Sequence, residues 1–96
     1  MGHDIKRVSL PRDCDTPFAA ALHEDISRDL TGLGELQIDA SAVERINTPA
    51  IQFLVMLARA LGTENIHMSV ESCSQAFISG FEQLGLGAQL AEWRAA

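Results

Sequence analysis

Three short segments with the alternating pattern of half-buried strands, each followed by a helix-like segment, constrain the fold most strongly. They lie at residues 4–10, 36–40 and 65–70, whereas residues 11–15 are expected to form a loop. Strands that alternate with helices pair in parallel, because each helix carries the chain back to the starting end of the sheet. The order predicts an α/β domain with a small mixed, mainly parallel sheet and about four helices. Three strands make a small sheet, which leaves room for an additional edge strand in the first residues.

The first helix is expected to begin at Thr16, with either Thr16 or Asp15 as its cap. Pro17 fits the first helical position, where its missing N–H costs no hydrogen bond. Gly32 and Gly34 are expected to end the helix and form the turn. The residues that recur every four positions should form its buried stripe: Phe18, Leu22, Ile26 and Leu30.

The most apolar helix is expected at residues 48–61. Thr48 is interpreted as its N-cap, Pro49 as its first residue and Gly62 as its stop. A helix that is apolar around most of its circumference is either central to the core or presents part of its surface to a partner. Its apolar residues are Ala50, Ile51, Phe53, Leu54, Val55, Met56, Leu57, Ala58, Ala60 and Leu61.

The remaining segments complete the expected order of elements. Residues 41–47 should leave the second strand, with Val43 and Ile46 turned inward. Ser72 followed by Gln75 has the spacing of a capping box for the next helix. The buried stripe of that helix should comprise Cys73, Phe77, Ile78, Phe81 and Leu84, and a short last helix at 88–93 should dock through Leu90 and Trp93.

A single domain is expected over residues 1–96, because the chain is short and 47% of its residues are apolar. The net charge is −6, which argues against nucleic acid, whose phosphates are bound by Lys and Arg. The same charge argues against an anionic membrane surface. A basic protein partner is compatible with it.

The expected location is the cytoplasm. Cys14 and Cys73 lie far apart and form no CxxC pair, as expected of free thiols in a reducing compartment. No positively charged segment followed by an apolar run opens the chain, so a signal peptide is not expected. The apolar run at 50–60 is too short to cross a bilayer, and direct membrane insertion is not expected.

No catalytic set is recognisable in the sequence. His3, His23 and His67 match no common zinc pattern with the cysteines, and no Gly-rich phosphate-binding motif occurs. Asp39 and Glu44 are interpreted as a strand-end residue and a loop charge, not as an acid–base pair. We therefore expect a non-catalytic protein without a cofactor or metal.

Thr48 is the residue whose position suggests a function. A helix N-terminus carries unsatisfied N–H groups and a partial positive charge, so a phosphate on Thr48 would be stabilised there. A plain N-cap explains the same position, and position alone leaves both interpretations open. The docking surface expected around it consists of Asn47, Thr48, Pro49, Ala50, Ile51 and Gln52.

The run IDASAVERINTPAIQFLVMLAR at 38–59 resembles the signature segment of STAS domains, the family of sulfate-transporter tails and anti-sigma factor antagonists. In that family a strand ends in an Asp, as at Asp39, and a loop with a Val follows, as at Val43. An Asp-Ser or Asp-Thr then opens an apolar helix. The likeness continues through the strand at 66–70, Ser72 and the run FEQLGL at 81–86, and it covers about residues 5–93.

By this resemblance, Thr48 corresponds to the residue that a partner serine/threonine kinase phosphorylates in anti-sigma antagonists and stressosome proteins. Asn47 stands where the family has Asp, and Pro49 and Ala50 stand where it has Ser-Gly or Thr-Gly. The first strand of the usual fold is expected to be short or missing.

The resemblance implies a protein partner of one of two kinds. The first is a signalling kinase with a histidine-kinase-like ATPase fold, in partner switching or beside chemotaxis kinases. The second is the ATPase of a phospholipid-trafficking ABC transporter, of which this chain would be the small STAS subunit. Some STAS domains instead bind nucleotides or lipids, and an enzyme is the remaining class.

Overall fold

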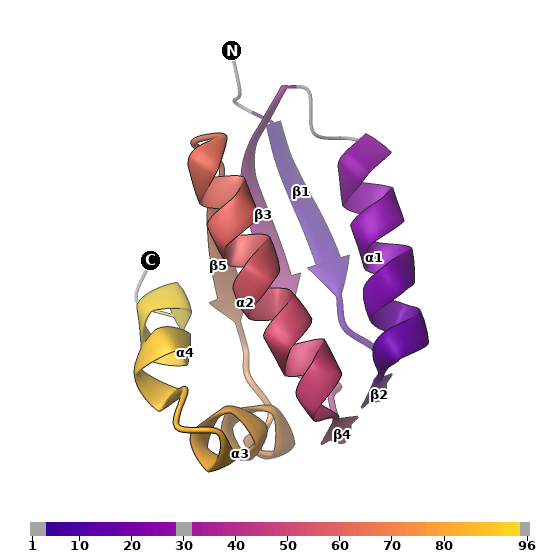
Figure 1. Cartoon of the computed structure of the whole chain (residues 1–96), viewed down its shortest axis with the longest axis vertical. Coiled ribbons are helices and arrows are strands. Elements are labelled where there is room, and N and C mark those ends of the chain that lie inside the picture. The colour runs from indigo at the N-terminus through magenta and orange to yellow at the C-terminus, as the bar shows by residue number, and fades with distance from the viewer. Residues whose placement is uncertain (1–3, 29–31, 95–96) are drawn as a thin grey trace.

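The computed structural model describes residues 4–28 and 32–94 of the chain. A three-stranded sheet is built from β1 (Asp4–Ser9), β3 (Leu33–Asp39) and β5 (His67–Glu71), in the order β1-β3-β5. Both pairings are parallel, as Figure 1 shows. The predicted α/β fold with a mainly parallel sheet is therefore confirmed.

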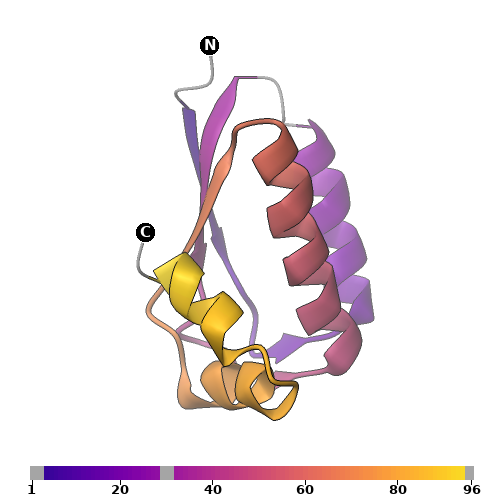
Figure 2. The same cartoon turned by 60° about the vertical axis from the view of Figure 1, so that its left-hand side comes forward.

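Within residues 4–28 and 32–94, four helices accompany the sheet, as predicted. The two long ones, α1 (Thr16–Arg28) and α2 (Thr48–Thr63), lie side by side on one face of the sheet (Figures 1 and 2). The two short ones, α3 (Gln75–Gln83) and α4 (Gly87–Arg94), follow β5 at the C-terminal end of the described chain. The two long helices consequently form one layer, and the sheet forms the other.

The core lies between these two layers. Alternate residues of the strands point toward the helices, and Leu36 and Ile38 of β3 are completely buried. They meet the buried faces of the two helices, which are formed by Ala19, Leu22 and Ile26 of α1 and by Ala50, Ile51, Leu54, Leu57 and Leu61 of α2. Each fully buried aliphatic side chain contributes about 1.5–3 kcal/mol. The alternation in the sequence therefore identified the core face of the strands correctly.

A second cluster packs the C-terminal helices. The rings of Phe77 and Phe81 lie 4.9 Å apart, and Trp93 meets Phe81 edge-on at 5.4 Å. All three side chains are buried, and Leu90 joins them in the core, so Trp93 and Leu90 dock α4 as expected. Leu84 was expected in the buried stripe of α3, but it is 41% exposed at the C-cap of that helix.

Two strands were not expected. The segment 11–15, expected as a loop, contains β2 (Asp13–Cys14), and residues 41–47 contain β4 (Arg45–Ile46). The two segments pair in parallel, Asp13 with Arg45 and Cys14 with Ile46. Strands of two residues carry no alternation, so the sequence contains no signal for them.

Side-chain hydrogen bonds identify the caps of α1 and α3. Of the two caps expected for α1, Asp15 is the one used, because its Oδ1 accepts a hydrogen bond from Phe18 N–H at 3.1 Å. Ser72 does not cap α3: it has a positive φ of 52°, and Ser74 accepts from Phe77 N–H instead. Phe18 is only partly buried, and Leu30 lies outside the described residues.

Candidate functional site

The β2–β4 ladder places the beginnings of α1 and α2 beside each other. Each of the two strands ends two residues before the first residue of its helix. The backbone N–H of Asn47 also donates a hydrogen bond of 3.2 Å to the carbonyl oxygen of Cys14. Figure 1 shows both helices starting at the same end of the molecule, beside the carboxyl ends of the strands. The candidate site is therefore made of two helix N-termini.

Asn47, and not Thr48, is the N-cap of α2. It has the extended backbone of a cap (φ −94°, ψ 165°), and its Oδ1 accepts a hydrogen bond of 2.9 Å from Ala50 N–H. The Asn47 carbonyl accepts the next one, from Ile51 N–H at 3.1 Å. The prediction of Thr48 as the cap is wrong. Asn and Thr are both good caps, and Asn is slightly better, so adjacent candidates are hard to separate from sequence.

Thr48 is instead the first helical residue, and its side chain is exposed. Asn47, Pro49 and Gln52 are exposed as well, so the four residues form one continuous surface on the first turn. Ala50 and Ile51 are each only 2% exposed. Among the six residues predicted for partner binding, these two belong to the core and fix the turn in place. The other four residues lie at the surface, as a docking site requires.

The helix end has few free amides for a phosphate. Pro49 has no N–H, and Ala50 N–H is already bonded to the Asn47 side chain. The expected stabilisation of a phosphate on Thr48 by the helix amides is correspondingly weak. The added charge would therefore act mainly on whatever protein contacts this surface.

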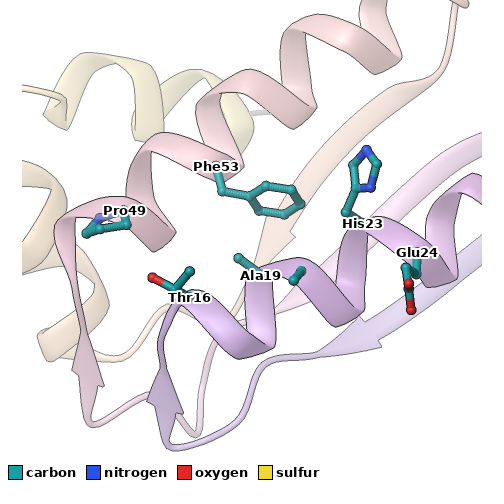
Figure 3. A pocket seen from close by; sticks show the side chains of 7 residues that line it. Thr16, Ala19, His23, Glu24, Pro49 and Phe53 are labelled. Carbon is teal, nitrogen blue, oxygen red and sulfur yellow. The ribbon is translucent and has the colours of Figure 1, made fainter.

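A groove opens beside Thr48, between α1 and α2. It has a volume of about 490 Å³ and is lined by Thr16, Ala19, Ala20, His23 and Glu24 from α1 and by Pro49 and Phe53 from α2. Figure 3 shows the Phe53 ring projecting from α2 toward α1, with His23 nearby. The His23 and Phe53 rings meet edge-on, 6.3 Å apart. Apolar side chains therefore extend from the first turn of α2 along the space between the helices.

Charged side chains flank the loops that lead into the two helices. Arg12 Nε lies 2.7 Å from Glu44 Oε2, and Arg12 Nη2 lies 3.2 Å from Glu44 Oε1. This hydrogen-bonded pair lowers the pKa of Glu44. Asp39 Oδ1 accepts a hydrogen bond from Ser41 N–H, which lowers the pKa of Asp39. Both carboxylates thus have structural partners, in keeping with their interpretation as a strand-end residue and a loop charge.

The exposure of Met56 was not predicted. Its side chain is 67% exposed on the outer side of α2, one turn beyond Gln52. A helix that is apolar around its circumference does not reveal which side the sheet will leave uncovered. Single exposed apolar side chains are common on protein surfaces, so Met56 by itself does not identify an interaction surface.

The other predicted features lie apart from this site. Cys14 is buried beneath it with its thiol 3.6 Å from the carbonyl oxygen of Pro11, and Cys73 is half-buried; both are free. His67 is exposed on β5, and His3 lies outside the described residues. Within residues 4–28 and 32–94, no group of three or more His, Cys, Asp or Glu side chains could hold a metal ion. None of the helices in those ranges is both long and apolar enough to cross a bilayer.

Comparison with protein families gives one match. A family model described as "Mlab, STAS domain" matches residues 4–92, which is most of the chain. The match includes both helix starts and the whole groove between α1 and α2. Searches of the curated proteins and of the solved structures found no significant match.

Proposed function

Because the chain belongs to the STAS domain family, which supports a regulatory or partner-binding role, we propose that it docks a signalling kinase of the ATPase type. The docking surface is formed by the exposed residues Asn47, Thr48, Pro49 and Gln52 at the start of α2, and Thr48 is the candidate phosphoacceptor. The protein acts as a non-catalytic partner-switching module in the cytoplasm, in the manner of anti-sigma factor antagonists or of chemotaxis-kinase partners.

The observation that carries this proposal is the exposed Thr48 on a rigid first turn. The Asn47 cap and the buried side chains of Ala50 and Ile51 hold that turn in place. A partner therefore meets a preorganised surface, which reduces the entropy cost of binding. The neighbouring apolar groove provides the contact area that one threonine cannot supply.

Phosphorylation of Thr48 would act as a charge switch on this surface. It adds about −1.5 to −2 charges at neutral pH. The chain already carries a net charge of −6, and the Ala50 amide, which would otherwise be free to bind the phosphate, donates to Asn47. The added charge is therefore presented to the partner and changes the affinity of the complex.

The test is a binding titration with candidate signalling kinases of the ATPase type from the same organism, measured by calorimetry. Thr48→Glu should change the dissociation constant at least about tenfold relative to Thr48→Ala, since a charge at an interface is worth more than about 1.4 kcal/mol. Gln75→Glu, on the exposed start of α3, is the matched charge control and should bind like the wild type. Equal affinity of wild type, Thr48→Ala and Thr48→Glu would exclude a switch at this residue.

A second candidate is the small STAS subunit of a phospholipid-trafficking ABC transporter, which would place the same surface against the transporter ATPase. The observation in its favour is that the cap, Asn47, is neutral. The phosphorylated members of the family carry an Asp at this position. Here the Thr48 hydroxyl would itself contact the ATPase, and no phosphate is needed. Co-purification with an ABC ATPase that is lost in Thr48→Ala but retained in Thr48→Ser would select this function.

A further inference from the structure

A phosphate on Thr48 would find little counter-charge in its own helix. Pro49 has no N–H, and the N–H groups of Ala50 and Ile51 both donate to Asn47, one to its side chain and the other to its carbonyl oxygen. Positions 49, 50 and 51 therefore offer none of the free amides that usually bind a phosphate at a helix start. The counter-charge has to come from a neighbouring segment.

Two arginines lie on the segments that lead into α1 and α2, and they are held differently. Arg12 is fixed by Glu44, with Nε 2.7 Å from one carboxylate oxygen and Nη2 3.2 Å from the other. Arg45 has only a long contact, of 4.0 Å between its Nε and Asp13 Oδ1, and its side chain is 86% exposed. Arg45 is therefore the arginine that can change its partner at low cost.

Strand β4 places the Arg45 side chain on the same side as the residue before Thr48. Ile46 packs inward, where its Cγ2 lies only 2.7 Å from a Cβ built on Gly80. Neighbouring side chains of a strand point to opposite sides, so Arg45 and Asn47 lie on the outer side. Both of them line a hollow of about 340 Å³ at the β2–β4 ladder. Arg45 thus borders the exposed surface that Thr48 continues.

The chain length between Arg45 and Thr48 keeps the two side chains within reach. Three residues span at most about 10–11 Å between Cα atoms, even when fully extended. A long arginine side chain and a phosphothreonine can bridge that distance together. The planar guanidinium also matches two phosphate oxygens at once, which a point charge cannot do.

Two carboxylates line the same hollow, those of Asp13 and Asp15. Asp15 is engaged at the start of α1, where its Oδ1 accepts a hydrogen bond from Phe18 N–H. Asp13 is the present partner of Arg45 and would compete with the phosphate. A phosphate carries up to two negative charges and three acceptor oxygens, against one charge on a carboxylate, so the exchange favours the phosphate.

We propose that Arg45 binds the phosphate of phosphorylated Thr48 and leaves Asp13 to do so. The inference rests on the proposed function and supplies the structural basis of its switch. The exchange opens the Asp13–Arg45 contact across the β2–β4 ladder and holds the phosphate on that side of the docking surface. One modification thereby changes two features that a partner meets: a negative group is added, and the exposed arginine is no longer available.

The pKa of the phosphate tests this in the full chain, without any kinase. Phosphothreonine is incorporated genetically at position 48, and ³¹P NMR follows its second ionisation over about pH 4 to 8. A bound arginine stabilises the dianion and lowers this pKa. Arg45→Gln should therefore raise it by about 0.3–0.7, the range of an exposed ion pair, and Arg45→Lys should give an intermediate value.

Arg59→Gln is the matched control, because it removes the same charge from another exposed position of the chain. Arg59 lies about three turns beyond Thr48 on α2, roughly 16 Å at 1.5 Å per residue. That distance exceeds the screening length of about 8 Å at physiological salt, so the phosphate pKa should stay within about 0.1 of its value in the unsubstituted phosphorylated chain. Both arginines are exposed, and both variants should keep the wild-type melting curve.

The outcomes separate this inference from the proposed function. Equal phosphate pKa values with Arg45 and with Gln at position 45 would overturn the arginine–phosphate pair, while the kinase titration with Thr48→Glu still decides the proposed function. An equal rise in Arg45→Gln and Arg59→Gln would reduce the effect to net charge and overturn the pair as well. A rise confined to Arg45→Gln supports the pair, and absence of kinase binding would then remove the proposed function alone.

Discussion

The backbone N–H of Asn47 and the carbonyl oxygen of Cys14 are joined by a hydrogen bond of 3.2 Å, which holds the start of α2 against the segment leading into α1. The side chain of Asn47 caps α2 at the same time. This residue therefore stabilises the start of α2, while its neighbour Thr48 is exposed at the surface. Stability and binding should be separable by mutation at these adjacent positions.

Asn47→Ala should lower the free energy of unfolding by about 0.5–2 kcal/mol, because Ala50 N–H loses its acceptor. Thr48→Ala should stay within about 0.5 kcal/mol of the wild type, since Thr48 is exposed and is not the cap. Urea denaturation measures both. Asn47→Asp is the control: it keeps an acceptor and adds a favourable charge at the helix N-terminus, so it should be at least as stable as the wild type. A larger loss for Thr48→Ala than for Asn47→Ala would identify Thr48 as the cap after all.

Two glycines should respond to alanine in opposite directions. A Cβ at Gly80 would lie 2.7 Å from Ile46 Cγ2 and 3.2 Å from Ile51 Cδ1, so Gly80→Ala should destabilise the fold by about 1–3 kcal/mol. A Cβ at Gly62 meets no atom within 4 Å, and Gly62 lies within α2. Gly62→Ala should therefore stabilise by about 0.5–1 kcal/mol. Thermal melts of the two variants give the comparison, and stabilisation by Gly80→Ala would show that α3 does not pack on Ile46 and Ile51 as described.

The Arg12–Glu44 pair should make the free energy of unfolding depend on pH in the acidic range. Its hydrogen bond lowers the pKa of Glu44 below the ordinary value of 4.5. The stabilisation is therefore present above the unfolded-state pKa and is lost as the pH falls through the lower folded-state pKa. Arg12→Gln should raise the pKa of Glu44 toward 4.5, which an NMR titration of its side-chain carboxyl resonance measures. An unchanged Glu44 titration in Arg12→Gln would mean that the pair does not persist in solution.

The two cysteines should differ in reactivity. Burial raises the pKa of Cys14 to about 11, and its side chain is only 3% exposed. Roughly one Cys14 thiol in a thousand is then ionised at pH 8, and reagents cannot reach it without local opening. Titration of the native protein with an aromatic disulfide reagent should show one faster phase, from the half-buried Cys73, and Cys73→Ser should remove that phase. A fast phase that persists in Cys73→Ser would place Cys14 at the surface.

Much of the fold could be predicted because its signals are periodic. The alternation that includes Leu36, Ile38 and Met68 gave the strands, their core face and the parallel order. The family likeness added the location of the site. Choices between adjacent residues of similar chemistry were less predictable. Both Asn47 and Thr48 can cap a helix, and the structure uses the first.

The surface of α2 could not be predicted for a different reason. Its sequence is apolar on nearly all sides, and only the arrangement of sheet and helices determines which sides remain uncovered. Ile51 is buried in the core, whereas Met56 is exposed at the surface. The groove between α1 and α2 depends on this choice and on the placement of α1 beside α2, which the short β2–β4 ladder supports. Neither a two-residue strand nor the relative position of two helices has a local pattern in the sequence.

The parallel sheet has a consequence for how the chain folds. Lys6 pairs with Leu36, and Leu36 pairs with Met68, so each partnership spans an intervening helix and none can form as a local hairpin. Closing these long loops costs chain entropy, and the strand contacts that offset this cost form only afterwards. The helices therefore have to form, at least transiently, before the sheet is complete. We expect relatively slow folding with α2 structured early, so changes that strengthen its first turn should speed refolding more than changes in β1.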